Sequence, residues 1–527
     1  MSSTRAKSIR ISGKSATFQI EKLVLNVLQS RMRLLINLLF SFFSVTTVYG
    51  DWAGSRPNII LIIADDMAWN DCGAYGNSKI NTPNIDRLAR EGMRFDRAFL
   101  TISSCSPSRA SIITGRYPHQ TDAEQLHWPI PGHQITFSER LMKAGYWTAS
   151  AGKWHMGEAI KRRFDVVKEA DMSGFIASPK GTFQESAQGD AKSGASQWVK
   201  TMRERPKDKP FFLWLAALDP HRPYDKKILK NPTKPADVIL PPYVPDTPGV
   251  RGDFALYYDE IRRLDRFLGE VMAEIKNQKI DDKTMVLFIS DNGRPMPRDK
   301  TTLYDSGIRT PWIVRWPGKV AAGSVCSKLV SSVDIAKCFM DLAGADYGGN
   351  FVGKSFLPLL ENPKIGVRQY VFGEKNWHDF SDRCRYVRDV RFKYIRNDYP
   401  HYANTPPADA LRSPVFRMMQ KLRDAKKLNA AQMNCFLKPR PKEELYDVSR
   451  DPHELRNLAS HPEHAKVLAR MREELENWGK RTDDRKPEFE APDEFDRETC
   501  LPLPVRHRPR ASKAEMLKQY RENGYIK

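Results

Sequence analysis

Short apolar runs that alternate with amphipathic helical segments constrain the fold of this chain more than any other feature. Three runs are almost wholly apolar and a fourth strand follows a helical segment, at 58–64, 211–218, 285–290 and 146–152. Apolar runs without polar alternation predict strands that are covered on both faces. Helical patterns separate them, as crossovers between parallel strands require, at 84–92, 137–145 and 257–275. The sequence therefore predicts an α/β fold built on a doubly wound, mostly parallel sheet.

The chain is long enough for a second, smaller domain, because its 527 residues exceed what one hydrophobic core usually organises. The pattern of predicted elements in the sequence changes near residue 370. The segment 386–397 is typical of a hairpin, and 443–459 is typical of a strand, a turn and the start of a helix. We expect the α/β domain over 51–370 and an α+β domain with an antiparallel sheet over 371–500.

Two further segments depart from the α/β pattern. Residues 203–248 are dense in proline, which predicts a long ordered excursion with little regular structure. Residues 501–527 form a basic tail, for which we expect a loose arrangement with a short helix.

An apolar run near the amino terminus has the composition of a secretory signal. Arg31 and Arg33 precede it, and small residues close it at Gly50. This pattern predicts export with cleavage after Gly50, and an extension before Met32, within an amino-terminal region 1–50. The alternative is an uncleaved anchor, but about 16 apolar-rich residues are few for a bilayer span, so no stable membrane span is expected.

The net charge of +21 is unevenly distributed. Residues 1–33 carry +6 and residues 501–527 carry +5, which leaves +10 on residues 34–500. A basic, exported body favours a polyanionic substrate. No nucleic-acid-binding motif accompanies the charge, so no nucleic-acid partner is expected. A generally basic proteome explains the charge almost as well.

The seven cysteines have no CxxC spacing that would indicate zinc or redox chemistry. They stand at positions 72, 105, 326, 338, 384, 435 and 500. In an exported protein up to three disulfides could form and leave one thiol over, and Cys105 is the candidate for that thiol.

Polar residues follow each predicted strand, where ligands bind in open α/β sheets. They are Asp65 and Asp66, Lys153 and His155, Asp219 and His221, and Asp291 and Asn292. Carboxylates that converge at one rim repel each other unless a cation lies among them. Such oxygen ligands favour a hard divalent ion, calcium or magnesium, over zinc or copper. The alternative is that each aspartate caps a turn.

Cys105 begins a helix in this interpretation, because Pro107 suits the first helical turn and Gly115 ends the segment. The free N–H groups of a helix start attract anions, and Arg109 lies about one turn further on. Position 111 is Ser111, so the Cys-x5-Arg spacing of a thiolate phosphatase is missing, and the pattern is Cys-x-Pro-x-Arg.

Cys105-Ser-Pro-Ser-Arg109 followed by "ASIITGR" resembles the signature of type I sulfatases, in which this cysteine becomes formylglycine. "ADDM", "NTPNIDRLAREGMRF", "GKWHMG", "DPHRPY", "SDNG", "YDSGIRTP" and "ELYDVSRDPHELRNLA" follow in family order across nearly the whole chain. The resemblance implies an alkaline-phosphatase-like α/β fold with a smaller carboxyl-terminal domain. It also implies a sulfated carbohydrate substrate and a maturation enzyme as partners.

The resemblance assigns roles residue by residue. Its calcium ligands match Asp65, Asp66, Asp291 and Asn292, with the formylglycine at Cys105 completing the shell. Its catalytic and sulfate-binding positions match Arg109, Lys153, His155, His221 and Lys300. Trp154, Glu374 and His378 are weaker candidates. His378 and Asp379 could reach the site from the smaller domain, and the alternative is that His378 is an ordinary surface histidine.

Residues 240–265 and 290–304 resemble the heparan N-sulfatase (sulfamidase) branch, which removes sulfate from terminal N-sulfoglucosamine. Leu218 replaces a histidine of that branch and Lys300 an arginine, which could retune whether an amine or an alcohol leaves. An O-sulfatase acting on another polysaccharide or an aryl sulfate therefore stays open. So do a phosphohydrolase on the same fold and a polyanion-binding protein whose Cys105 is never oxidised.

Overall fold

The computed structural model describes residues 52–171, 189–226, 228–504 and 512–524. The predicted signal peptide and its cleavage site lie outside these residues. Within them, no helix combines the length and the apolar character that crossing a membrane requires. Residues Asp51–Lys527 form one compact unit.

The main sheet has eight strands in the order β5-β4-β6-β1-β7-β8-β2-β9. Their bounds are β5 Val166–Glu169, β4 Trp147–Gly152, β6 Phe211–Ala216, β1 Asn58–Ala64, β7 Thr284–Ser290, β8 Trp312–Arg315, β2 Met93–Phe95 and β9 Ser324–Cys326. The first five are parallel, and β8 is antiparallel to both of its neighbours. This arrangement confirms the predicted mostly parallel sheet and the position of all four predicted strands.

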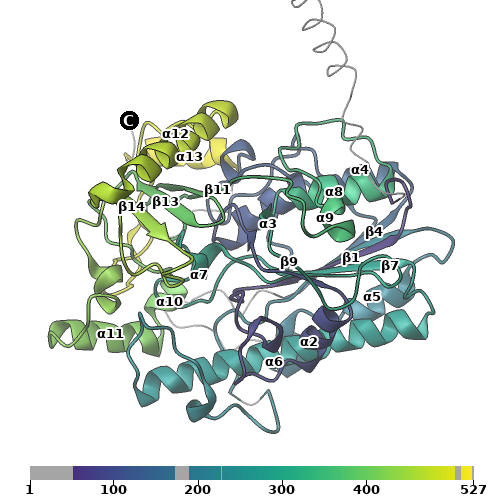
Figure 1. Cartoon of the computed structure of the whole chain (residues 1–527), viewed down its shortest axis with the longest axis horizontal. Coiled ribbons are helices and arrows are strands. Elements are labelled where there is room, and N and C mark those ends of the chain that lie inside the picture. The colour runs from purple at the N-terminus through teal and green to yellow at the C-terminus, as the bar shows by residue number, and fades with distance from the viewer. Residues whose placement is uncertain (1–51, 172–188, 227, 505–511, 525–527) are drawn as a thin grey trace, which may run out of the picture. The chain divides into compact units, whose positions relative to one another are not determined.

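Both faces of the sheet are covered, which explains why its central strands are so apolar. In β1, Ile59, Leu61 and Ile63 pack into one core and Ile60 and Ile62 into another. Successive side chains of a strand point to opposite faces, so each face needs its own apolar set. The helices on the first side are α3 Cys105–Thr114, α4 Phe137–Lys143, α8 Asp334–Ala343 and α9 Leu357–Glu361 (Figure 1). On the other side lie α2 Pro83–Arg90, α5 Trp198–Glu204 and the long α6 Pro248–Asn277 (Figure 1).

A second, antiparallel sheet has the order β11-β12-β13-β14, as expected for a smaller α+β part. Its strands are β11 Val371–Lys375, β12 Cys384–Arg388, β13 Phe392–Asn397 and β14 Glu443–Asp447. One face packs on α12 Ala465–Thr482, and the other packs on residues around α7 Asp305–Ile308. The predicted boundaries at 370 and 500 stay predictions, but the two sheets contribute to one continuous body. Among the described residues, a short parallel pair, β3 Ala98–Phe99 and β10 Val330–Ser331, and the helices α10 Ala408–Leu411 and α11 Pro414–Asp424 complete the strands and α-helices before the tail.

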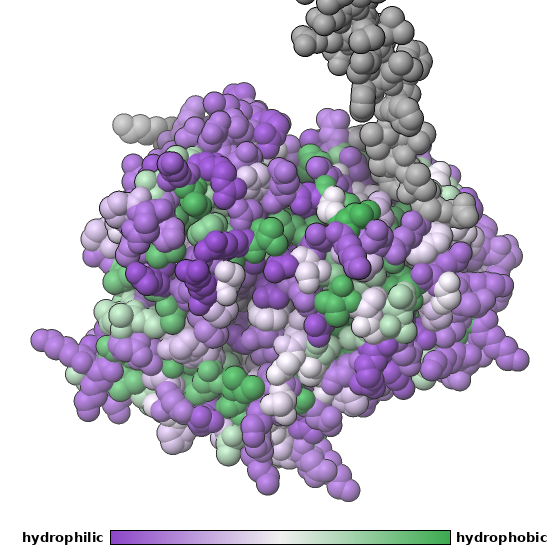
Figure 2. All heavy atoms as spheres, viewed as in Figure 1, coloured by the Kyte–Doolittle hydropathy of each residue, from purple (hydrophilic) through white to green (hydrophobic). Residues whose placement is uncertain are grey.

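One local prediction is wrong: the segment 452–459 is irregular, and the next helix starts only at Ala465, after the 3-10 turn η8 Pro462–His464. The predicted short helix of the tail is present as α13 Lys513–Glu522, but it is not loose, because it buries Met516 and Tyr520 against the main core. Residues 203–248 include the end of α5 and the whole of β6. Between β6 and α6 the described residues have little regular structure, as the prolines predict, apart from the 3-10 turn η6 Pro235–Asp237. Most of the face in Figure 2 is hydrophilic, with small separate groups of hydrophobic side chains.

Candidate active site

Four acidic and amide residues meet where β1 and β7 end. The two strands pair in register up to Ala64 and Ser290, so the residues that follow them emerge side by side. The Asp66 N–H donates to Asp291 Oδ1 at 3.3 Å, and the Asn292 amide donates to Asp66 Oδ1. These side chains are fully buried. The structure thus brings together all four residues that the sequence proposes as metal ligands.

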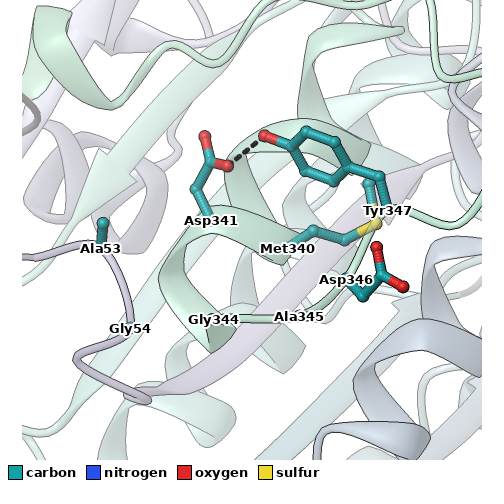
Figure 3. Close-up of a pocket in the computed structure, with 8 residues that line it drawn as sticks. All are labelled: Ala53, Gly54, Met340, Asp341, Gly344, Ala345, Asp346 and Tyr347. Carbon is teal, nitrogen blue, oxygen red and sulfur yellow. Dashed lines mark hydrogen bonds between the residues drawn. The ribbon is translucent and has the colours of Figure 1, made fainter. Parts of the chain in front are cut away.

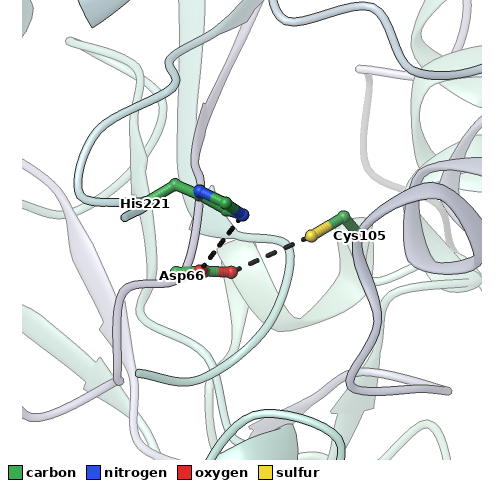
Figure 4. Close-up of side chains that lie close together, drawn as sticks. All are labelled: Asp66, Cys105 and His221. Carbon is green, nitrogen blue, oxygen red and sulfur yellow. Dashed lines mark hydrogen bonds and ion pairs between the residues drawn. The ribbon is translucent and has the colours of Figure 1, made fainter. Parts of the chain in front are cut away.

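Cys105 faces this acidic cluster from the first turn of α3. Its Sγ lies 3.6 Å from Asp65 Oδ1 and 3.9 Å from Asp66 Oδ1 (Figure 4 shows the contact with Asp66). Ser104 precedes the helix in an extended conformation, and Gly115 ends it with a left-handed φ of 59°. The helix therefore spans the predicted segment and places its amino-terminal end at the site.

Each carboxylate of the cluster has a close cationic partner, and Asp65 also lies 3.9 Å from Arg109. Asp291 pairs with Arg109 at 2.8 Å, Asp66 with Lys300 at 2.8 Å, and Asp65 with Lys153. The Arg109 guanidinium also donates to the Lys153 carbonyl at 3.1 Å, which ties α3 to the end of β4. The structure places these three predicted cations around Cys105.

His221 reaches the same cluster from the loop after β6, and a residue that the sequence reading missed accompanies it. His221 Nε2 lies 3.8 Å from Asp66 Oδ2 and 3.6 Å from Asp409 Oδ2 (Figure 4 shows the contact with Asp66). Asp409, on α10, also pairs with Lys300 at 3.1 Å. It follows no predicted strand and belongs to no quoted motif, so only the folded chain reveals it. Asp219, by contrast, pairs with Arg263 on α6 and not with the cluster.

His155 contacts a second histidine that the sequence reading missed. Its Nε2 lies 2.7 Å from Nδ1 of His127. The His127 backbone N–H donates to Ser106 Oγ at 2.8 Å, next to Cys105. This chain of contacts holds the histidine pair beside the start of α3.

The three weaker candidates have different surroundings, and they do not all lie at the site. His378 Nδ1 lies 2.7 Å from Oγ of Ser104, the residue before Cys105, so it reaches the site from the second sheet. Glu374 bonds His119 instead, and the Trp154 indole donates to Gly157 O inside the core. Of the three, only His378 contacts an element of the candidate site.

Burial and charge oppose each other at these groups. Burial, with help from the Asp65 charge, raises the pKa of Asp66 and of Asp291 to about 7, although Lys300 and Arg109 lower it. Burial would also raise the pKa of Asp65, but Lys153 and the other cations hold it below its ordinary value. Burial and the nearby Lys300 charge lower the pKa of His221 to about 3. The arrangement therefore favours a neutral imidazole and extra positive charge among the carboxylates.

The backbone around the site is strained at several non-glycine positions. Asp66, His127, His155 and Thr301 all have positive φ, between 53° and 72°. Such conformations cost about 1 to 3 kcal/mol each and persist only where the surrounding structure imposes them. Their concentration around Cys105 is typical of a site in which side-chain placement matters more than local stability.

The donor atoms at the cluster fit a hard divalent cation. The carboxylates of Asp65, Asp66 and Asp291 supply oxygen atoms. Asn292 Oδ1 is buried and accepts no hydrogen bond from any described residue, although its amide nitrogen donates twice. A buried amide oxygen among carboxylates is a ligand set that calcium and magnesium prefer.

All seven cysteines lie in the described part of the chain, where they are buried free thiols. The three disulfides that the composition allows are therefore not formed. Burial raises the pKa of the Cys105 thiol well above its ordinary value, even though Lys153 and Lys300 oppose the shift. An unmodified Cys105 is thus a poor nucleophile.

A hollow of about 470 Å³ beside α8 has a different character (Figure 3). It is lined by Ala53, Gly54 and residues of 340–347, and the Tyr347 hydroxyl there donates to Asp341. Its lining contains two carboxylates and no basic side chain, so it does not suit a sulfated ligand.

Comparison with protein families gives two matches. The Sulfatase model matches residues 57–345, and a model of the N-sulphoglucosamine sulphohydrolase carboxyl-terminal region matches residues 297–405. Human N-sulphoglucosamine sulphohydrolase is 30% identical over 478 residues, 82% of this chain and 91% of the human protein. An ulvan-active sulfatase of Formosa agariphila is 29% identical over 480 residues, 80% of this chain and 74% of that protein.

Solved structures share the fold. A protein solved with its substrate D-glucosamine-2-N,6-O-disulfate aligns with a TM-score of 0.62 and 21% identity, over 82% of this chain and 99% of that one. The phosphonate monoester hydrolase of Agrobacterium radiobacter aligns with a TM-score of 0.62 and 18% identity, over 81% of this chain and 96% of that one. Identities this low establish the architecture and no particular substrate.

Proposed function

Because this chain belongs to the sulfatase family, we propose that it hydrolyses sulfate from sulfated sugars, and specifically from N-sulfoglucosamine at the end of heparan-like chains. The observation that carries the activity is the convergence of Cys105, three carboxylates and three cations at one buried point. The specific substrate is supported by 30% identity to human N-sulphoglucosamine sulphohydrolase along most of both chains.

We propose that Cys105 is oxidised to formylglycine by a maturation enzyme and that Asp65, Asp66, Asp291 and Asn292 hold one calcium ion. The bound cation would supply a Lewis acid that acidifies a hydroxyl beside it. The hydrated formylglycine would supply two hydroxyls on one carbon, one to attack sulfur and one to lose its proton when sulfate departs.

The remaining residues position the sulfuryl group and move protons. Arg109 and Lys153 offset the charge that builds on the sulfuryl oxygens, a kind of electrostatic help worth about 3 to 4 kcal/mol per donor in a well-studied protease. His155 accepts the proton of the second hydroxyl at position 105, and His127 orients its ring through the contact at 2.7 Å.

The leaving group lies on the His221 side in this proposal. His221 Nε2 and Lys300 Nζ both lie near the Asp409 carboxylate, at 3.6 Å and 3.1 Å. His221 is neutral in the free site, so in this proposal it takes up a proton when the negatively charged sulfate group binds and passes it to the departing nitrogen or oxygen, while Asp409 holds the Lys300 ammonium beside it. A carboxylate at this point also accepts an N–H bond, which suits an amine that leaves.

A second candidate is an O-sulfatase that acts on another polysaccharide. The ulvan-active sulfatase of Formosa agariphila is 29% identical, a value comparable to that of the human protein. The same catalytic residues would serve an alcohol leaving group, so the distinction depends on the sugar contacts and on Asp409.

The deciding experiment combines two measurements on protein made with and without a formylglycine-generating enzyme. The peptide that contains Cys105 is weighed, and sulfate release is measured from N-sulfated and 6-O-sulfated glucosamine. We expect a peptide lighter by the exchange of sulfur and two hydrogens for one oxygen, together with release from the N-sulfated sugar. Release from the O-sulfated sugar alone would overturn the substrate, and faster cleavage of a phosphate ester would favour a phosphohydrolase.

Export through the predicted signal peptide is part of the proposal, because a sulfated polysaccharide is an extracellular or lysosomal kind of substrate. The amino-terminal sequence of protein recovered outside the cytoplasm tests it, and we expect Asp51 as the first residue. Recovery of an intact amino terminus would contradict the cleavage at Gly50.

A further inference from the structure

Two segments that are far apart in the sequence hold the residues on either side of Cys105. We call 122–128 and 374–378 the flanking segments. Each contributes a histidine, His127 or His378, that contacts a serine next to Cys105 at 2.8 Å or 2.7 Å. The position of the flanking segments therefore affects the geometry at the start of α3.

The flanking segments are bonded to each other. The Leu126 N–H donates to the Trp377 carbonyl oxygen at 3.3 Å. The Asn376 side-chain amide donates to the Glu124 carbonyl oxygen, also at 3.3 Å. Because these bonds join the two segments, a displacement of one segment is passed to the other and so to both sides of Cys105.

The carboxyl-terminal helix α13 contacts the first flanking segment. Lys513, the first residue of the helix, donates from Nζ to Glu124 Oε1 at 2.5 Å, although the two residues are 389 positions apart. Its Nζ also lies 5.9 Å from the centre of the Trp128 ring. Further along the helix, Met516 and Tyr520 are each 1% exposed and belong to the apolar core that contains Trp128. The helix is thus fixed to the segment by one ion pair and to the core below it by two apolar side chains.

The ion pair joins a helix to a carboxylate that has little access to water. The Glu124 side chain is 15% exposed, and no other cation among the described residues forms an ion pair with it. Burial raises the pKa of the Glu124 carboxyl, and the Lys513 charge opposes this shift. Removing one partner of such a pair leaves the other charge poorly solvated. Loss of the Lys513 charge should therefore move the Glu124 side chain, and the flanking segment with it.

We propose that α13 positions the flanking segments, and through them His127 and His378, with the Lys513–Glu124 pair as the principal polar contact. Lys513 and Glu124 are positioning residues in this proposal, because they act through the two histidines. The inference rests on the proposed function for what the histidines do during turnover, not for the coupling between α13 and the segments.

Amide hydrogen exchange of the full chain tests the coupling directly, because the Leu126 and His127 amides donate bonds that the flanking segments depend on. Mass spectrometry with residue-resolving fragmentation compares Lys513→Ala with Lys518→Ala, which removes the same charge from an exposed ion pair of the same helix. We expect exchange of the two amides to be about two- to fivefold faster in Lys513→Ala than in the control. Lys513→Arg keeps the charge and should exchange as the wild type does.

A second pair of variants detaches the whole helix. Met516→Asp places a charge where the side chain is 1% exposed, whereas Ala514→Asp places the same charge at an exposed position of α13. We expect Met516→Asp to speed exchange at Leu126 and His127 by about tenfold or more, since an unpaired buried charge is costly. Equal exchange of these two amides within either pair of variants would overturn the proposal.

Turnover separates positioning from simple coverage of the core. We expect Lys513→Ala to lower kcat on N-sulfoglucosamine about two- to fivefold with little change in KM, and Lys513→Arg to restore it. A helix that only covers apolar surface would lower Tm and leave the kcat of the folded protein unchanged, which would overturn the positioning role. If no sulfated sugar is hydrolysed by the wild type but amide exchange responds as expected, the proposed function fails and the coupling of α13 to the flanking segments stands.

Discussion

The chemistry proposed at Cys105 needs two hydroxyl groups on one carbon, which hydrated formylglycine has and serine does not. A serine at this position offers one oxygen to attack sulfur but no second hydroxyl from which sulfate can be expelled. We therefore expect Cys105→Ser protein to release at most one leaving group per molecule and to become heavier by one SO3 group. Intact-protein mass spectrometry after incubation with substrate measures this. Continuous turnover by the serine variant would contradict the proposed mechanism.

Asp409 is expected to act through Lys300 and His221. Replacing it by asparagine removes the charge that holds the Lys300 ammonium at 3.1 Å. We expect Asp409→Asn to lower kcat on N-sulfoglucosamine about tenfold, or ~1.4 kcal/mol in the barrier, with a smaller change in KM. Asp424→Asn is the control, because Asp424 is exposed at the end of α11. A kcat equal to that of the control would show that Asp409 has no role in turnover.

The sequence identified the residues that immediately follow strands, because parallel strands bring their carboxyl ends together regardless of loop detail. Asp65, Asp291 and Lys153 are of this kind. Asp409 and His127 lie on segments with no strand before them, and their positions depend on how long connections pack. Reading local patterns could not place them.

At the scale of single elements, the junction of β4 and β6 places Lys153 by close backbone contact. Gly152 has φ of 105°, and a Cβ there would lie 1.8 Å from the Ala216 carbonyl oxygen. We expect Gly152→Ala to lower the free energy of unfolding by more than about 1 kcal/mol. Gly249→Ala is the matched control, since a Cβ at that helical position meets nothing within 4 Å. Urea unfolding of both variants checks this, and equal stabilities would contradict it.

His119 joins the 3-10 turn η2 Pro118–Gln120 to β11 and to the end of α12. Its Nδ1 lies 3.1 Å from Glu374 Oε1 and its Nε2 lies 3.1 Å from the Thr482 carbonyl oxygen. Both partners only accept, so both ring nitrogens carry hydrogen. Burial lowers the pKa of His119, but the Glu374 charge outweighs it and the pKa lies above its ordinary value.

A raised pKa makes this contact strongest in acid. Its contribution to stability is fully present below the pKa of the unfolded chain and is lost as the pH rises through the folded value. We expect the stability difference between the wild type and His119→Gln to shrink as the pH rises from about 6.5, the ordinary value for histidine, through the raised folded value. Urea unfolding at several pH values measures it. Parallel pH profiles for the two proteins would show that His119 does not titrate as a cation.

The sequence predicted the elements of the main sheet better than those of the second part. In a strand that is buried on both faces nearly every residue is apolar, so the whole segment indicates a strand. The residues of 452–459, by contrast, are compatible with a helix, but tertiary packing holds them in turns. Likewise, the sequence indicated a short helix in the basic tail, but not that two of its side chains, Met516 and Tyr520, would pack it against the main core.

At the scale of the whole molecule, binding of a divalent cation at the proposed site should raise the thermal stability of the folded chain. Ions that bind only the folded chain stabilise it, by about 2.7 kcal/mol at a concentration one hundred times Kd. We expect calcium to raise Tm relative to chelated protein, and magnesium to raise it less. The shift should vanish in Asp291→Asn and persist in Asp424→Asn. A Tm indifferent to chelation would contradict a divalent cation site at the ends of β1 and β7.

The burial of α3 also limits the time during which a maturation enzyme could reach Cys105. Cys105 is 2% exposed once α3 is enclosed, and the partners that enclose it are made late. Arg109 and Asp291 are 182 residues apart, an interval that a ribosome adding about 5 to 20 residues per second completes in on the order of 10 to 40 s. An enzyme that oxidises Cys105 must act within that delay or hold the chain open beyond it. The active fraction of a preparation would then be set by a race between oxidation and folding, and slowing translation or export would raise it without any change in sequence.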